Sequence, residues 1–114
     1  MRALAPFAFS PDVDSQLLAR FITKKSADVQ PDHGYRGQIA AVLAHDALDR
    51  LGAIERPTLV ITGSEDVVVP PENSETLCER IPQAQLEVIA GAGHLFFAEQ
   101  PGRTLATLET FLLD

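Results

Sequence analysis

The feature that most constrains the fold of this chain is a pair of short apolar runs on either side of a helical segment, within residues 57–94. The runs cover residues 58–61 and 86–89, and each is followed by glycine. Continuous apolar and β-branched runs of this length are typical of strands buried on both faces of a parallel sheet. Residues 72–81 show helical period between them. The sequence therefore predicts a right-handed βαβ unit with parallel strands.

An aspartate and a histidine follow the two predicted strands. Asp66 lies just after the first run and His94 just after the second. The carboxyl ends of neighbouring parallel strands meet at one edge of an open α/β sheet, so the two side chains are expected to lie close together. A carboxylate beside an imidazole fixes the tautomer of the ring and stabilises the imidazolium, as in a nucleophilic triad. Asp66 and His94 are therefore candidates for an acid–base pair.

Five short motifs surround this pair and indicate a family. They are Pro-Thr-Leu-Val-Ile-x-Gly-x-x-Asp-x-x-Val-Pro, Ile-Pro-x-Ala-x-Leu, Gly-Ala-Gly-His, Glu-x-Pro and a final Phe-Leu. Together they resemble the C-terminal third of the α/β-hydrolase superfamily, and the resemblance is carried mainly by residues 54–113. In that family the acid matching Asp66 and the base matching His94 follow a serine nucleophile in chain order.

The resemblance implies an α/β fold in which the chain forms the C-terminal part of an α/β-hydrolase sheet. Two parallel strands with flanking helices and a partial helical cap are expected. The whole chain would be a single incomplete domain, in which residues 1–50 are the cap tail with its return to the core and residues 51–114 are the last two βα units. Two strands cannot bury both faces of a sheet, so we expect association with a missing N-terminal half or self-association.

Helices are predicted on either side of this unit. Ser10, Pro11 and Asp12 have the composition of a helix start, and that helix is expected to run to about residue 24. A loop over 28–34, a helix over 35–44 and a short helical turn over 46–51 should follow. The final helix is predicted over 102–113. It should bury four apolar side chains, namely Leu105, Leu108, Phe111 and Leu112.

The nucleophile of the resembled family is absent from these 114 residues, because they contain no G-x-S-x-G motif. The resemblance implies hydrolysis of an ester, lactone or similar acyl bond of a small molecule, with this chain supplying only the acid and the base. The alternative is a catalytically inactive, truncated remnant or association module. A small redox or receiver-like module is a weaker interpretation, since such a module does not require the histidine turn.

Three other side chains are rival candidates for roles in this chemistry. Glu65 lies in the same turn as Asp66, but the family pattern favours Asp66 and we expect Glu65 to be solvated. Ser64 is a poor nucleophile candidate, since it lacks a strand-to-helix elbow. Cys78 lies on the apolar face of the helix over 72–81, so it is expected to be a packed thiol with a raised pKa.

A metal or cofactor site is not expected. His33 and His45 could join Asp32 or Asp46 as ligands, but their spacing matches no known ligand pattern. Gly-Ala-Gly-His is not a phosphate loop, because the lysine and the following serine or threonine of that loop are missing.

The bulk composition excludes several partners. The formal net charge of −7 argues against nucleic acid and anionic membrane. No apolar run approaches the length of a membrane span. The single cysteine cannot form an internal disulfide, so a cytoplasmic location is the expectation.

Overall fold

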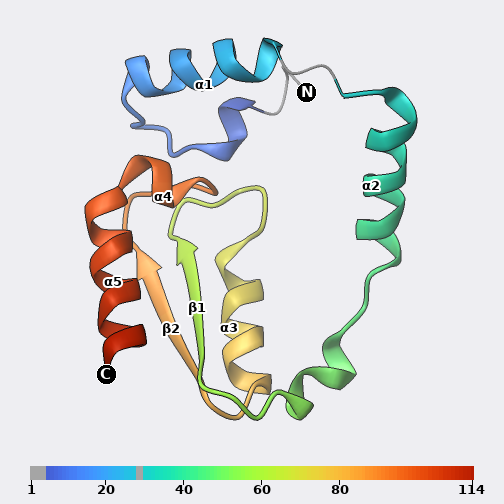
Figure 1. Ribbon diagram of the computed structural model, residues 1–114, viewed down its shortest axis with the longest axis vertical. Coiled ribbons are helices and arrows are strands. Elements are labelled where there is room, and N and C mark those ends of the chain that lie inside the picture. The colour runs from blue at the N-terminus through green and yellow to red at the C-terminus, as the bar shows by residue number, and fades with distance from the viewer. Residues whose placement is uncertain (1–4, 28–29) are drawn as a thin grey trace.

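The centre of the fold is a two-stranded parallel sheet with a helical crossover. The computed structural model describes residues 5–27 and 30–114 (Figure 1). Strands β1 (Thr58–Gly63) and β2 (Ala84–Ile89) pair in parallel, from Thr58 opposite Ala84 to Gly63 opposite Ile89. Helix α3 (Pro71–Arg80) connects them. The predicted βαβ unit is confirmed, with both strands slightly longer than the apolar runs that predicted them.

The remaining elements lie before and after this unit. In chain order they are η1 (Ala5–Ala8), α1 (Ser15–Ala27), α2 (Asp32–Ala44), η2 (Leu48–Ala53), α4 (Phe96–Glu99) and α5 (Pro101–Leu113). None of the helices in the described ranges is both long enough and apolar enough to cross a membrane.

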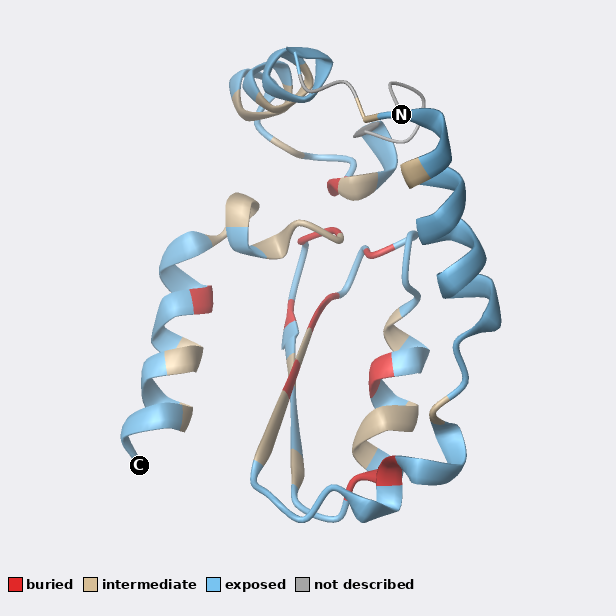
Figure 2. Cartoon of the chain, turned by 45° about the vertical axis from the view of Figure 1, so that its right-hand side comes forward, coloured by how far each residue is buried: buried red, intermediate tan, exposed pale blue. Residues whose placement is uncertain are grey.

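Helices α3 and α5 lie on opposite sides of the sheet (Figures 1 and 2). Helix α3 contacts both strands, whereas α5 contacts β2. The apolar side chains that are buried include Val60 of β1, Ile89 of β2 and Ile81 at the end of α3. The core therefore lies mainly between the sheet and α3.

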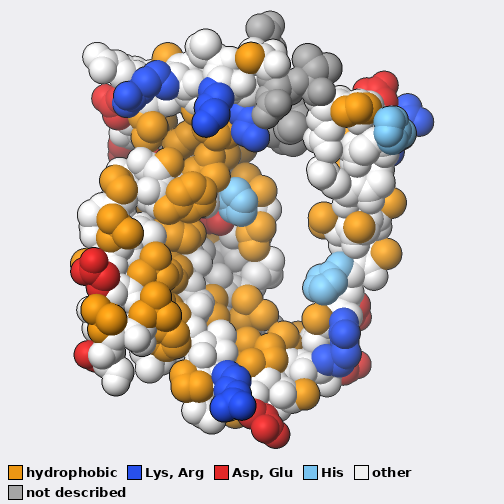
Figure 3. Space-filling model, viewed as in Figure 1, with side chains coloured by type: hydrophobic (Ala, Val, Ile, Leu, Met, Phe, Trp, Pro, Cys, Tyr) orange, Lys and Arg blue, Asp and Glu red, His pale blue; other side chains and the backbone are white. Residues whose placement is uncertain are grey.

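The burial expected for β2 and α5 is wrong in part. Leu86 and Val88 of β2 are exposed, and so are Leu105 and Leu112 of α5, which are 58% and 72% accessible. A groove of about 610 Å³ separates the sheet from α5 and is lined by both elements. Figure 3 shows hydrophobic side chains gathered on this side of the molecule. Two strands form too narrow a sheet to cover a helix of this length.

The first long helix begins later than predicted. Helix α1 starts at Ser15, and the Asp14 carboxylate accepts a hydrogen bond from the Leu17 N–H at 2.8 Å. Asp14 therefore has the capping role that the sequence assigns to Ser10. Ser10 is instead buried and donates its hydroxyl to Glu99, far away in the sequence. A long-range hydrogen bond has overridden a local capping signal.

The second helix begins earlier than predicted, and the turn after it is shifted. Helix α2 starts at Asp32, so residues 32–34 are helical although the sequence predicts a loop there. Residues 28–29 of that expected loop lie outside the described residues. The helical turn expected over 46–51 is η2, at Leu48–Ala53, and the Asp46 carboxylate accepts the Leu48 N–H at 3.1 Å.

Helix α2 stands apart from the sheet (Figure 1). It exposes Ile39, Val42 and Leu43, the three apolar residues that predict it. The radius of gyration is 16.0 Å, whereas a compact domain of this length would have about 13 Å. The division of the chain into a cap tail over 1–50 and a core portion over 51–114 stays a prediction.

Candidate functional site

Asp66 and His94 are in contact at the carboxyl edge of the sheet. Asp66 follows β1, His94 follows β2, and Asp66 Oδ2 lies 2.9 Å from His94 Nδ1. Asp66 is buried, while the His94 side chain is 40% accessible. The structure thus brings together the two residues that the sequence selects, as the parallel pairing of their strands requires.

Asp66 is fixed by its own turn as well as by the histidine. Its Oδ1 atom accepts hydrogen bonds from the N–H groups of Val68 and Val69, both at 2.9 Å. A local turn role and a pairing role are therefore not alternatives here, because each uses a different oxygen of the carboxylate. Two backbone donors hold Oδ1 and orient Oδ2 toward His94.

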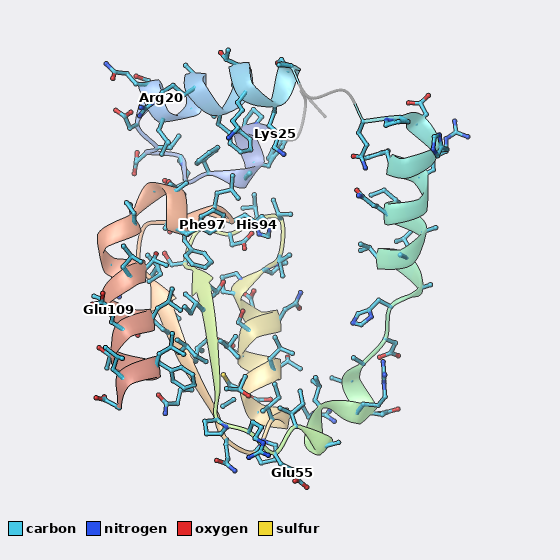
Figure 4. The ribbon with its side chains drawn as sticks, in the orientation of Figure 1. Arg20, Lys25, Glu55, His94, Phe97 and Glu109 are labelled. Atoms are coloured by element: carbon cyan, nitrogen blue, oxygen red, sulfur yellow. The ribbon has the colours of Figure 1, made fainter. Side chains whose placement is uncertain are left out.

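The contact also determines which nitrogen of His94 is available for chemistry. An ionised carboxylate can only accept hydrogen bonds, so Nδ1 of His94 must carry the proton in this pair. In neutral His94 the lone pair therefore lies on Nε2. No described residue bonds to Nε2, and the His94 side chain lies near the strand ends, on the side that faces η1 (Figure 4). Because the side chain is partly accessible, the ring can take a proton from a group brought to Nε2.

The turn after β1 and the loop after β2 are tied together by three hydrogen bonds. The Ser64 N–H donates to Ile89 O at 3.0 Å, and the Glu65 N–H donates to Ala92 O at 2.9 Å. In the opposite direction, the Gly91 N–H donates to Ser64 Oγ at 2.8 Å. These bonds fix the positions of the two segments that carry Asp66 and His94.

Two glycines allow this close approach. A Cβ atom on Gly63 would lie 2.2 Å from Ala92 O and 2.3 Å from Gly93 O, so no side chain fits there. Gly91 has a φ of 75°, in the left-handed region that favours glycine. Gly63 at the end of β1 and Gly91 after β2 therefore serve the geometry of the pair.

The structure places the rival residues elsewhere. Glu65 is exposed, and among the described residues only Asp66 bonds to His94. The Ser64 hydroxyl accepts the Gly91 N–H and so holds the loop. Cys78 is half-buried in α3, and desolvation raises the pKa of its thiol, which confirms the predicted direction.

The side chains considered for metal binding are dispersed. His33 and His45 are exposed near opposite ends of α2, and Asp32 and Asp46 are exposed beside them. In residues 5–27 and 30–114 no group of three His, Cys, Asp or Glu side chains is arranged to hold a metal ion.

Glu99 is a residue that the sequence analysis did not single out. Its carboxylate, in α4, accepts hydrogen bonds from Gly93, one residue before His94, and from Ser10, in the N-terminal segment. The only signal for it in the sequence is the Glu-x-Pro motif, which contributes to the resemblance without indicating any contact.

Comparison with known proteins identifies the same fold. A family model described as "alpha/beta hydrolase fold" matches residues 1–101. The chain is 37% identical over 79 residues to a poly(3-hydroxyalkanoate) depolymerase of Ectopseudomonas oleovorans, covering 69% of the chain and 28% of that protein. It is 33% identical over 101 residues to 3-oxoadipate enol-lactonase 1 of Acinetobacter baylyi, covering 89% and 37%.

Solved structures give the same result. An esterase from Exiguobacterium antarcticum superimposes with a TM-score of 0.86 at 26% identity, covering 99% of this chain and 41% of the esterase. The chain therefore spans less than half the length of each of these three proteins.

The packing of Gly63 can be tested by substitution. Gly63→Ala should lower the free energy of unfolding by about 1–3 kcal/mol, because its methyl group would meet backbone atoms that cannot rotate away. Gly37→Ala is the matched control, since that position lies within α2 with no atom nearby. It should be neutral or stabilising by up to about 1 kcal/mol. Urea unfolding measures both, and equal stability of Gly63→Ala and the parent chain would contradict the packing.

The raised pKa of Cys78 predicts that its thiol is alkylated slowly. At a given pH a raised pKa lowers the thiolate fraction, and the thiolate is the nucleophile. Alkylation of Cys78 by iodoacetamide, followed by mass spectrometry across pH, should be slower in the folded chain than in urea. The folded profile should also be displaced to higher pH. Faster alkylation in the folded chain would refute this assignment.

Proposed function

This chain belongs to the α/β-hydrolase family, and we propose that it supplies the acid and the base of a Ser-His-Asp hydrolase. The substrate class is an ester, a lactone or a similar acyl bond in a small molecule. The observation that carries the proposal is the 2.9 Å contact between Asp66 Oδ2 and His94 Nδ1. That contact leaves Nε2 of His94 as the ring nitrogen that can accept a proton.

The proposed reaction has two halves. A serine hydroxyl from outside this chain attacks the acyl carbon while Nε2 of His94 takes its proton. His94 then gives the proton to the departing alkoxide, which leaves as the alcohol. Water next attacks the acyl-serine, His94 takes the proton of the water, and the acid product leaves as the proton returns to serine. Asp66 stabilises the imidazolium in both halves.

The similar proteins support this reaction class. An enol-lactonase, an esterase and a polyester depolymerase are named for cleavage of acyl–oxygen bonds. The chain contains no G-x-S-x-G motif, so the proposal assigns the serine to another segment. No cofactor enters the proposed steps.

A chimera tests the roles of the pair. This chain would replace the part of the Exiguobacterium antarcticum esterase on which it superimposes, so that the esterase supplies the serine. Hydrolysis of p-nitrophenyl acetate is the readout. His94→Ala should lower kcat/KM by about 10⁴-fold to 10⁶-fold, and Asp66→Asn by about 10⁴-fold, because the proton acceptor or its orientation is lost.

His45→Ala is the matched control, since His45 is exposed at the end of α2 and should leave turnover unchanged. Unchanged turnover in His94→Ala would refute the acid–base assignment. A folded chimera whose serine is not phosphonylated by a fluorophosphonate probe would favour the non-catalytic association module.

We also propose that the open side of the sheet is covered by a partner. Both strands have an edge without a strand partner within the described residues, and the groove between the sheet and α5 is lined by Leu59, Leu86 and Phe111. Apolar surface of this kind is typical of an interface. The proposed partner is a segment that completes the sheet, and in its absence the chain is expected to bind a second copy of itself.

Light scattering after size exclusion tests this association. The purified chain should give a mass above its monomer mass of 12.3 kDa. Ala106→Glu places a charge in the groove without removing a core side chain and should shift the mass toward the monomer. Ala40→Glu, at an exposed position of α2, should not. A monodisperse monomer of the unmodified chain would contradict self-association.

A further inference from the structure

We propose that Glu99 is a positioning residue that holds the His94 loop against the N-terminal segment Phe9–Ser10. Glu99 acts on the backbone of the loop, whereas Asp66 acts on the ring of His94. The inference rests on the proposed function, since the position of His94 affects a reaction only if His94 is the base.

The Glu99 carboxylate joins two segments that are far apart in the sequence. Its Oε2 atom accepts the Gly93 N–H at 2.7 Å, one residue before His94. Its two oxygens also accept the Ser10 N–H, at 3.1 and 3.2 Å, and Oε1 accepts the Ser10 hydroxyl. Three donors therefore converge on one half-buried carboxylate, and an ionised carboxylate can accept from all three because it has about four lone-pair sites.

Close packing supports the same attachment. A Cβ atom on Gly93 would lie 2.5 Å from the carbonyl carbon of Phe9 and 2.6 Å from the nitrogen of Ser10, so the two backbones touch. On the other side of His94, the Leu95 N–H donates to Ala8 O at 2.8 Å. The residues before and after His94 are thus both held by the segment 8–10.

The segment 8–10 is itself anchored to α1. Phe9 is 3% accessible, and its ring meets that of Phe21 edge to face, with centroids 5.1 Å apart. Phe21 belongs to α1, so the contacts run from that helix through Phe9 and Ser10 to the loop of His94. Figure 4 shows His94 near the strand ends, with the segment after η1 between it and α1.

The need for such a support follows from the position of His94 in the chain. Strand β2 ends at Ile89, so the ladder does not fix the backbone of His94. A reacting group must be held within about 0.5 Å of its productive position, and a displacement of about 1 Å costs about 10²-fold in rate. Hydrogen bonds to a charged acceptor are among the strongest that a protein forms. Glu99 places such bonds next to the histidine.

Glu99→Gln is the substitution that tests this role. A glutamine amide has one acceptor oxygen and no charge, so in either orientation its NH₂ group faces the Gly93 N–H or the Ser10 hydroxyl, which the carboxylate serves with different oxygens. The readout is the Nδ1–H proton of His94 in the isotopically labelled, full 114-residue chain, observed by NMR. Its exchange with water reports how firmly the ring stays bonded to Asp66 in the folded state.

The exchange rate of this proton should rise about tenfold in Glu99→Gln, the effect of losing one charge-assisted hydrogen bond. Glu109→Gln makes the same change of charge on exposed α5 and should leave the rate unchanged. A residue that only stabilised the fold would lower the urea midpoint without altering this proton in folded molecules. That result would overturn the proposal.

Ser10→Ala keeps the inference testable if Glu99→Gln does not fold. It removes one of the three donors and leaves both backbone N–H groups, so the exchange rate should rise less, by about threefold. An unchanged rate in Ser10→Ala would then overturn the proposal. This measurement does not depend on turnover. If His94→Ala left turnover in the chimera unchanged, the catalytic role of His94 would be refuted. The exchange rates would still decide by themselves whether Glu99 positions the loop.

Discussion

The candidate site depends on the contact between the end of β1 and the loop after β2. Gly63 lies so close to the backbone of Ala92 and Gly93 that a methyl group could not be placed between them. This approach brings the turn of Asp66 to the loop of His94, and the hydrogen bond between their side chains follows from it. A larger residue at position 63 would separate the acid from the base although neither had changed. The chemistry of the pair is therefore a consequence of backbone packing.

The pair is held differently on its two sides. Asp66 is buried and is fixed by N–H groups of its own turn, so its orientation is encoded within a few residues. His94 is partly accessible and lies in a loop that depends on Glu99 and on a segment at the other end of the chain. The acid is thus a local feature and the base is a tertiary one. Substitutions in the N-terminal segment are therefore expected to alter the position of His94 more than that of Asp66.

The sequence predicts the βαβ unit and the meeting of Asp66 with His94 because both depend on local signals. Continuous apolar runs define the strands and a period of 3.6 defines the helix between them, and parallel pairing then determines which edge the two residues share. The sequence does not reveal the role of Ser10, whose local composition is that of a helix cap while its hydroxyl bonds to Glu99. It also overestimates the burial of Leu105 on α5, since periodicity selects the apolar face of a helix but not the width of the sheet beneath it.

The same contrast explains how an ordered acid–base pair coexists with an open fold. Helix α2 stands apart and apolar side chains of α5 remain exposed, yet the ties around Gly63 do not involve either of these elements. The positions of Asp66 and His94 depend on the strand ends and the turns that follow them. Burial of the apolar side of the sheet depends instead on what packs against that side. A partner that supplies the serine would therefore find His94 already oriented, with Nε2 as the atom to which the hydroxyl must be brought. Under the proposed function, the position of the serine is therefore the part of the site that a partner would have to supply.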